Sequence, residues 1–243
     1  MMQSEKKITR DNALDIIKQF AKEYRKELGK APAEIIIVGG GSIMLNYKFR
    51  EATQDFDVIL KAASGARDVI KRFADEQGLP RDWMNTDFIK TASYSDALSE
   101  VSKHYCSLNN GALEIRTVSG VYLIAMKLRA NRDYRNDISD AIGVLIEERR
   151  LGNAISYADI ENAYSKLYKT EIPDKLAEIM GPICDKNIDE LQAYYDMQNK
   201  MEHEVGDKIV TYINEGANIN TKNVDEVTAK IREKMKALLG LQD

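Results

Sequence analysis

A short β-branched run that ends at three consecutive glycines constrains the fold of this 243-residue chain more than any other segment. The run Glu34-Ile-Ile-Ile-Val38 has the length and composition of a buried strand, and Gly39, Gly40 and Gly41 break it sharply. A helix is expected to begin at Ser42. Consecutive glycines let a backbone approach a ligand closely, and the amides that open a helix favour an anion. The junction therefore predicts a phosphate-binding turn at Gly40, Gly41 and Ser42.

Two carboxylates follow on the next expected strand, Gln54 to Leu60. Side chains two residues apart share one face of a strand, so Asp55 and Asp57 project together while Phe56 and Val58 enter the core. Their Cα atoms would lie about 7 Å apart. This separation suits oxygen ligands for one or two Mg²⁺ (or Mn²⁺) ions. Solvent-facing carboxylates of a half-buried strand are the alternative, and only the preceding glycine-rich segment favours the metal site.

Glycine-rich turns after strands also occur in dinucleotide-binding and P-loop proteins. A G-x-G-x-x-G fingerprint that starts at Gly39 finds Met44 where its third glycine belongs. A P-loop needs Gly-Lys-Ser or Gly-Lys-Thr, and neither follows. Both patterns fail to fit this chain.

Strand and helix patterns are interleaved up to about residue 150, and only helical patterns follow. We therefore predict an α+β (α/β) domain over residues 1–150, with a mixed sheet flanked by helices, and an all-helical C-terminal region over residues 151–243. The expected helices are Asp11–Leu28 with Asp11 as N-cap, Ser64–Gln77, one from about Val121, Asp137–Glu148, Ser156–Tyr168, Asn187–Glu215 and Asn223–Leu239. A third strand is expected at Gly111–Val118.

Charge and composition narrow the partners. Residues 1–150 hold 24 Lys and Arg against 22 Asp and Glu, and residues 151–243 hold 11 against 17. Extended DNA binding needs a strongly basic face, so only a local basic patch could serve a polynucleotide here. Cys106 and Cys184 are isolated, which indicates neither a zinc site nor a disulfide framework. The polar N-terminus and short apolar runs predict a cytoplasmic protein with no membrane partner.

The spacing of these motifs resembles that of the nucleotidyltransferase superfamily, which has a DNA polymerase beta-like palm. In that superfamily a strand, a Gly-Ser turn and then Asp-x-Asp on the next strand form the signature, as Gly41-Ser42 and Asp55-Phe56-Asp57 do here. Further stretches resemble the bacterial AbiEii toxin-related minimal nucleotidyltransferase branch. They are Thr53–Asp57, Gly78–Asn85, and Leu123–Ala130 continuing to Arg132 and Asp137–Asp140. Together they cover roughly residues 34–146.

The resemblance implies roles for residues whose spacing alone assigns none. Lys127 would contact the triphosphate of a bound NTP, and Asp137 would belong to the same site. Glu114 has the form of the superfamily's third metal-ligating carboxylate, although the Asp137 region could complete the site instead. Arg132 could pair with phosphates, because a guanidinium matches phosphate geometry. A solvated Lys127 and a structural salt-bridge cluster around Arg132 are the alternatives.

The expected activity is metal-dependent transfer of an NMP from an NTP to an RNA, such as tRNA, or to a protein. By resemblance the chain could be the toxin of a bacterial toxin–antitoxin or phage-defence pair, with a cognate antitoxin as partner. Two alternatives remain open. One is a catalytically silent binding module that keeps the fold, and the other is a nucleotidyltransferase for small molecules of the antibiotic type. The residues specify neither the base nor the acceptor.

Overall fold

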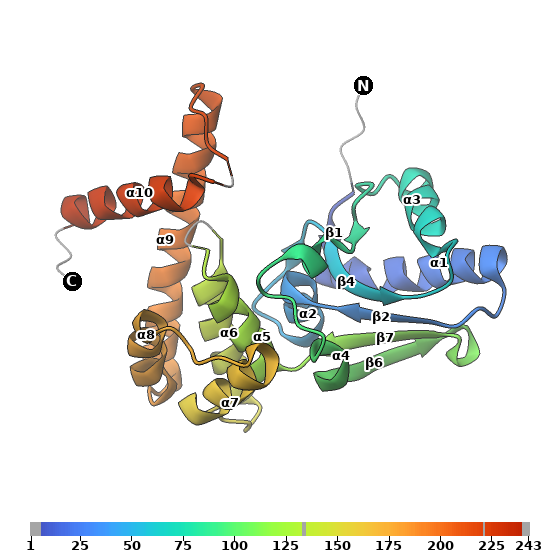
Figure 1. Ribbon diagram of the computed structural model, residues 1–243, viewed down its shortest axis with the longest axis horizontal. Helices are drawn as coiled ribbons and strands as arrows, with labels where there is room; N and C mark the ends of the chain where they lie inside the picture. Colours follow the sequence, from blue (N-terminus) through green and yellow to red (C-terminus); the bar gives the residue numbers. More distant parts are fainter. Residues whose placement is uncertain (1–5, 133–134, 221, 240–243) are drawn as a thin grey trace.

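The computed structural model describes residues 6–132, 135–220 and 222–239, and places a mixed sheet with its helices beside a helical region (Figure 1). Within the described residues the main sheet has five strands in the order β5-β4-β2-β7-β6. Strand β2 runs antiparallel to β4 and parallel to β7. The strands are β2 (Ala33–Ile37), β4 (Phe56–Lys61), β5 (Met84–Asn85), β6 (Ser102–Leu108) and β7 (Leu113–Val118); β1 (Ile8–Thr9) and β3 (Ala52–Thr53) pair separately.

Strand β2 is buried on both faces, as its β-branched composition predicts. Ile35 and Ile37 join a hydrophobic cluster with α1 (Arg10–Leu28) and α3 (Ala66–Gln77). Ile36 and Val38 enter a second cluster with α5. Trp83 completes the first cluster: it is fully buried, and its indole N–H donates to the carbonyl of Ile70 at 3.2 Å.

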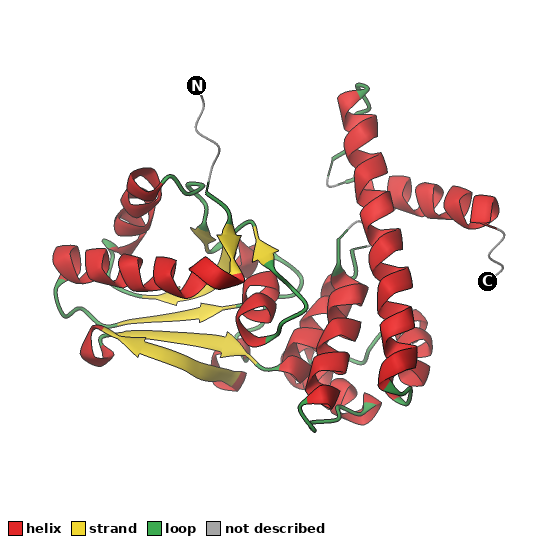
Figure 2. Cartoon of the chain, turned by 180° about the vertical axis from the view of Figure 1, so that it is seen from behind, coloured by secondary structure: helices red, strands yellow, loops and turns green. Residues whose placement is uncertain are grey.

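The region beside the sheet is helical (Figure 2). Within it, α6 packs between α5 and α9. The helices of this region are α5 (Gly120–Ala130), α6 (Asp137–Arg150), α7 (Tyr157–Tyr168), α8 (Asp174–Cys184), α9 (Ile188–Asn214) and α10 (Val224–Leu239). Helix α10 crosses α9 at a steep angle (Figure 1). In the part of the chain that the structure describes, no helix has the length and apolarity that crossing a bilayer requires. The predicted fold class, a mixed sheet with helices followed by a helical region, is confirmed.

One hydrophobic cluster extends from β2 through α5 and α6 to α7 and α8, so it runs across the boundary expected near residue 150. The division into two domains therefore stays a prediction. The structure also contains elements that the sequence patterns did not indicate, namely β5, the four-residue α4 (Leu98–Val101), β6 and α8. Strand β6 is a polar edge strand, Ser-Lys-His-Tyr-Cys-Ser-Leu, and α8 contains Pro182, so neither shows the usual apolar pattern.

Two expected helix starts are wrong by a few residues. The N-cap of α1 is Thr9, two residues before the expected Asp11. Helix α2 (Gly39–Asn46) begins at the first glycine, so the three glycines form its first turn rather than a separate loop. Val38 is the N-cap in extended conformation, and Ser42 N–H donates the first helical hydrogen bond to its carbonyl at 3.3 Å.

Candidate active site

The two expected carboxylates lie together at one end of the sheet. Asp55 directly precedes β4, Asp57 is its second residue, and both are half-buried. Asn85, which pairs with Asp57 across β4 and β5, donates to Asp55 Oδ2 at 2.9 Å. Its amide also lowers the pKa of Asp57, so this one side chain lies beside both acids. Asn85 belongs to the stretch Gly78–Asn85 that the sequence singled out, but no role was assigned to it.

Both carboxylates carry negative charge that the protein leaves largely uncompensated. Burial raises the pKa of Asp55, and the charge of Asp57 raises it further. Burial also raises the pKa of Asp57, although Asn85 and the positive charges of Arg132, Lys127 and Arg135 oppose the rise. Neither acid forms an ion pair with a described Lys, Arg or His. A half-buried acid pair without its own cation is suited to binding one.

The N-terminus of α2 lies against this acid pair. The amide groups of the three glycines have no partner within the helix, because the first helical bond starts at Ser42. Gly39 has φ +55°, and a Cβ placed on it would lie 3.9 Å from Asp57 Oδ2. A Cβ on Gly40 would lie 2.8 Å from the guanidinium of Arg50. Because Gly39 and Gly40 have no side chains, Asp57 and the guanidinium of Arg50 both lie directly against the N-terminus of α2.

Ser42 has a different position from the one expected of a phosphate ligand. Its side chain is fully buried. Its hydroxyl accepts from Val118 N–H at 2.9 Å and donates to the Val118 carbonyl at 3.3 Å. The hydroxyl therefore ties α2 to the end of β7. The predicted turn offers its glycine amides to a ligand, whereas Ser42 serves to hold that turn in place.

Gly41→Ala is expected to destabilise the protein by about 1–3 kcal/mol, because overpacking a buried site costs that much. An added Cβ would lie 2.6 Å from Phe56 Cδ1 and 3.0 Å from Ile37 Cγ2. Gly181→Ala in α8 is the matched control, because a Cβ there meets nothing within 4 Å. The control should be neutral or stabilise by roughly 0.5–1 kcal/mol. Urea unfolding measures both, and equal stabilities of the two variants would contradict this packing.

Lys127 is buried and held by two acids of α6. Its Nζ lies 2.9 Å from Asp137 Oδ1 and 2.8 Å from Asp140 Oδ2. Asp137 is fully buried and is also held by Arg132, whose Nε and Nη2 donate to its two oxygens at 2.9 and 3.1 Å. Asp140 receives Arg50 Nη1 at 2.6 Å. The structure therefore joins Lys127 and Asp137, as the resemblance implied, whereas Arg132 forms the salt-bridge cluster given as its alternative. Arg50 is an addition to this cluster.

The cluster contains three cations, Lys127, Arg132 and Arg50, and two acids, Asp137 and Asp140, so it keeps one excess positive charge. Burial opposes the charge of Lys127, but the carboxylates of Asp140 and Asp137 keep its pKa above the ordinary value. Burial likewise opposes the charge of Asp137, yet Lys127 and Arg132 lower its pKa to about 2. Asp137 is thus engaged with protein cations, whereas Asp55 and Asp57 form no ion pair with a described Lys, Arg or His. The solvated alternative for Lys127 is ruled out by its burial.

Glu114 lies elsewhere, and its expected role as a metal ligand beside Asp55 and Asp57 needs correction. In the sheet register it pairs with Glu34 of β2, whereas Asp57 lies beside Val38, four residues further along that strand. Glu114 is instead within 3.1 Å of His104. Among the described residues, no group of three or more His, Cys, Asp or Glu is arranged to hold a metal. The hydrophobic–acid–hydrophobic pattern predicted the strand but not its register.

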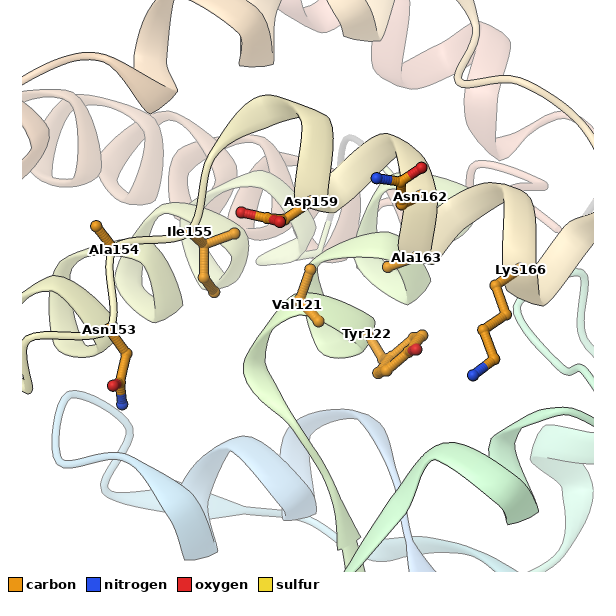
Figure 3. A pocket seen from close by; sticks show the side chains of 9 residues that line it. All are labelled: Val121, Tyr122, Asn153, Ala154, Ile155, Asp159, Asn162, Ala163 and Lys166. Atoms are coloured by element: carbon orange, nitrogen blue, oxygen red, sulfur yellow. The ribbon is translucent and has the colours of Figure 1, made fainter.

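A separate cavity of about 420 Å³ lies between α5 and α7 (Figure 3). Tyr122, Asp159, Asn162 and Lys166 are among its lining residues, and Lys166 Nζ lies 5.8 Å from the centroid of the Tyr122 ring. None of the residues expected at the site lines this cavity. The candidate active site is therefore the end of the sheet beside α2, and not this hollow.

Most of the chain matches the model of one protein family. Residues 12–179, well over half of the chain, match the family described as a nucleotidyltransferase of unknown function (DUF6036). The chain belongs to this family. No curated protein and no solved structure matches the chain. The family match supports the nucleotidyltransferase superfamily, while the AbiEii-related branch stays a prediction.

The matched stretch contains the acid pair, α2 and the whole Lys127 cluster. It ends within α8, so α9 and α10 lie beyond it. Two residues beside the acid pair and the Lys127 cluster escaped the sequence reasoning: Arg50 and Asn85. Arg50 precedes Asp55 by only five residues, and that proximity is the one local signal it offered.

Proposed function

We propose that this chain is a metal-dependent nucleotidyltransferase that moves an NMP from an NTP to an acceptor hydroxyl. One observation carries the proposal: Asp55 and Asp57 lie together beside Asn85, form no ion pair with a cation in the described part of the chain, and adjoin the glycine-rich N-terminus of α2. Membership of a nucleotidyltransferase family supports the same chemistry. Lys127 and Arg50 lie around this terminus and add positive charge for a triphosphate.

The donor set fits a magnesium ion. Carboxylate oxygens are the ligands that this hard cation prefers, and Asp55 and Asp57 would hold it. A bound Mg²⁺ would neutralise charge on the phosphate oxygens. The amides of Gly40 and Gly41 would bind terminal phosphate oxygens, and Lys127 would brace the triphosphate from a fixed position between Asp137 and Asp140. Arg132 is bidentate to Asp137, so it supports the site through that acid.

The reaction proposed is in-line substitution at the α-phosphorus. The acceptor hydroxyl loses its proton, its oxygen bonds to phosphorus, and the bond to the pyrophosphate oxygen breaks. An RNA such as tRNA, or a protein, is the proposed acceptor class. A role as the toxin of a toxin–antitoxin or phage-defence pair, with a cognate antitoxin as partner, rests on the AbiEii resemblance alone.

The test uses the purified full chain with Mg²⁺ and each of the four NTPs, labelled in turn at the α- and the γ-phosphate. Total RNA, tRNA and protein fractions are offered as acceptors. The α-label should be transferred from at least one NTP, the γ-label should not, and EDTA should stop the transfer. Transfer of the γ-label would indicate phosphoryl transfer instead. The proposal would be overturned if none of the four NTPs bound to the protein and none transferred its label.

A further inference from the structure

The N-terminus of α6 is capped by a side chain from a distant helix. Asn136, at the N-cap position, makes no side-chain capping hydrogen bond. Instead, Glu202 of α9 accepts the N–H of Ile138 at 3.0 Å through Oε1 and the N–H of Ser139 at 3.3 Å through Oε2. These are the second and third residues of α6, whose amides have no partner inside the helix. Glu202 supplies the cap that the helix lacks locally.

The carboxylate of Glu202 is buried and is held by hydrogen bonds at the N-terminus of α6. It is 1% exposed, and no described Lys, Arg or His forms an ion pair with it. Gln198 Nε2 donates to its Oε1 at 3.3 Å, and Asn199 contacts the Ser139 hydroxyl at 3.5 Å. Burial raises the pKa of Glu202, and its hydrogen bonds to α6 oppose that rise. A carboxylate at a helix N-terminus is also favoured by the helix dipole.

The first turn of α6, which Glu202 caps, also carries the two acids that bind Lys127. Asp137 and Asp140, the first and fourth residues of α6, are both within 3 Å of Lys127 Nζ. A shift of this turn would therefore move the ammonium group relative to Asp57, whose carboxylate feels its charge. Helix α9 runs along α6 (Figures 1 and 2) and lies beyond the stretch shared with the family.

We infer that Glu202 is a positioning residue of the nucleotide site, through which α9 sets the place of Lys127. The inference rests on the proposed function, because Lys127 is taken to brace the triphosphate. It gives α9 a role in positioning the nucleotide site, although α9 lies beyond the stretch shared with the family. A residue acting this way should affect the affinity for the nucleotide more than the fraction of folded protein.

Glu202→Gln tests the inference, with Glu204→Gln as the matched control on the same helix. Glutamine keeps the shape but offers one acceptor oxygen, and turns an NH₂ group toward the second backbone N–H. Glu204 is partly exposed, and its ion pair with Lys200 is long at 4.0 Å. Its substitution should therefore change neither KM nor kcat. For Glu202→Gln we expect KM for the NTP, and the Kd of the Mg²⁺–NTP complex, to rise about tenfold with kcat within about twofold.

The outcomes separate this inference from the proposed function. If Glu202→Gln behaves as the wild type, or if it lowers kcat through loss of folded protein with KM unchanged, the inference is wrong and the function stands. If the wild type binds no NTP, the proposed function fails. The positioning claim then has its own readout, namely faster amide exchange at Ile138 and Ser139 and a shifted Lys127 Nζ resonance in Glu202→Gln but not in Glu204→Gln. Unchanged exchange and resonance would overturn it.

Discussion

The double substitution Asp55→Asn and Asp57→Asn is expected to abolish nucleotidyl transfer and, at the same time, to raise the melting temperature of the ligand-free protein. Removing both carboxylates removes the oxygen ligands for the metal, which supplies several kcal/mol of charge stabilisation, so transfer should fall by at least about 10³-fold. Stability should rise because these two acids are half-buried, repel each other and form no ion pair with a described Lys, Arg or His.

The direction of the pKa shifts of Asp55 and Asp57 determines how the stability of the ligand-free protein depends on pH. Both carboxyl groups have a pKa raised above the unfolded value, so the folded state binds more protons than the unfolded state between the two values. Stability of the ligand-free wild type should therefore fall as pH rises through the folded pKa. The double variant lacks these groups, so its advantage should grow over the same window and then stay constant. Mg²⁺ should stabilise the wild type and leave the variant unchanged.

Thermal unfolding followed by circular dichroism, with and without Mg²⁺, measures these effects beside the transfer assay. Asp207→Asn, an exposed change on α9, is the matched control and should alter neither activity nor stability. A double variant that melts below the wild type would contradict the claim that the charges of Asp55 and Asp57 destabilise the folded protein. A double variant that still transfers label would remove Asp55 and Asp57 from the proposed mechanism.

The parts of the fold that could be predicted are those with a strong local pattern. The β-branched run of β2, the break at the glycines and the apolar stripes of α1, α3 and α9 each determine one element from adjacent residues. Elements with a weak local pattern were missed. The polar edge strand β6 is one of them, because an edge strand needs few apolar residues and obtains its partner from β7, several residues away.

The candidate site shows the same division between local and long-range information. Asp55 and Asp57 are two residues apart, so strand geometry alone brings them together. Asn85 reaches them only because β5 pairs with β4. Glu114 was misplaced because its pattern predicts a strand but contains no information on register. Glu202 lies 64 residues from Ile138, whose N–H it accepts, and no local pattern could have linked the two.

Asp137→Asn is expected to cost about 3–5 kcal/mol of unfolding free energy, because removing one partner of a buried ion pair leaves the others uncompensated. Asp137 is fully buried, and Lys127 and Arg132 both donate to it. Asp189→Asn is the matched control: Asp189 also lies in the first turn of a helix, α9, but is exposed, so its change reports the helix-dipole contribution alone. Urea unfolding at neutral pH measures the difference between the two.

The origin of that cost can be checked by pH and by a double-mutant cycle. The pKa of Asp137 is lowered to about 2, so its contribution is complete above the unfolded pKa and is lost as pH falls toward 2. The stability gap between the wild type and Asp137→Asn should therefore close on acidification. Adding Lys127→Met should cost less in Asp137→Asn than in the wild type, because the buried ammonium has already lost one acid. Additive costs, or a gap that persists at acid pH, would mean that Asp137 stabilises α6 by packing and that Lys127 depends on Asp140 for its position.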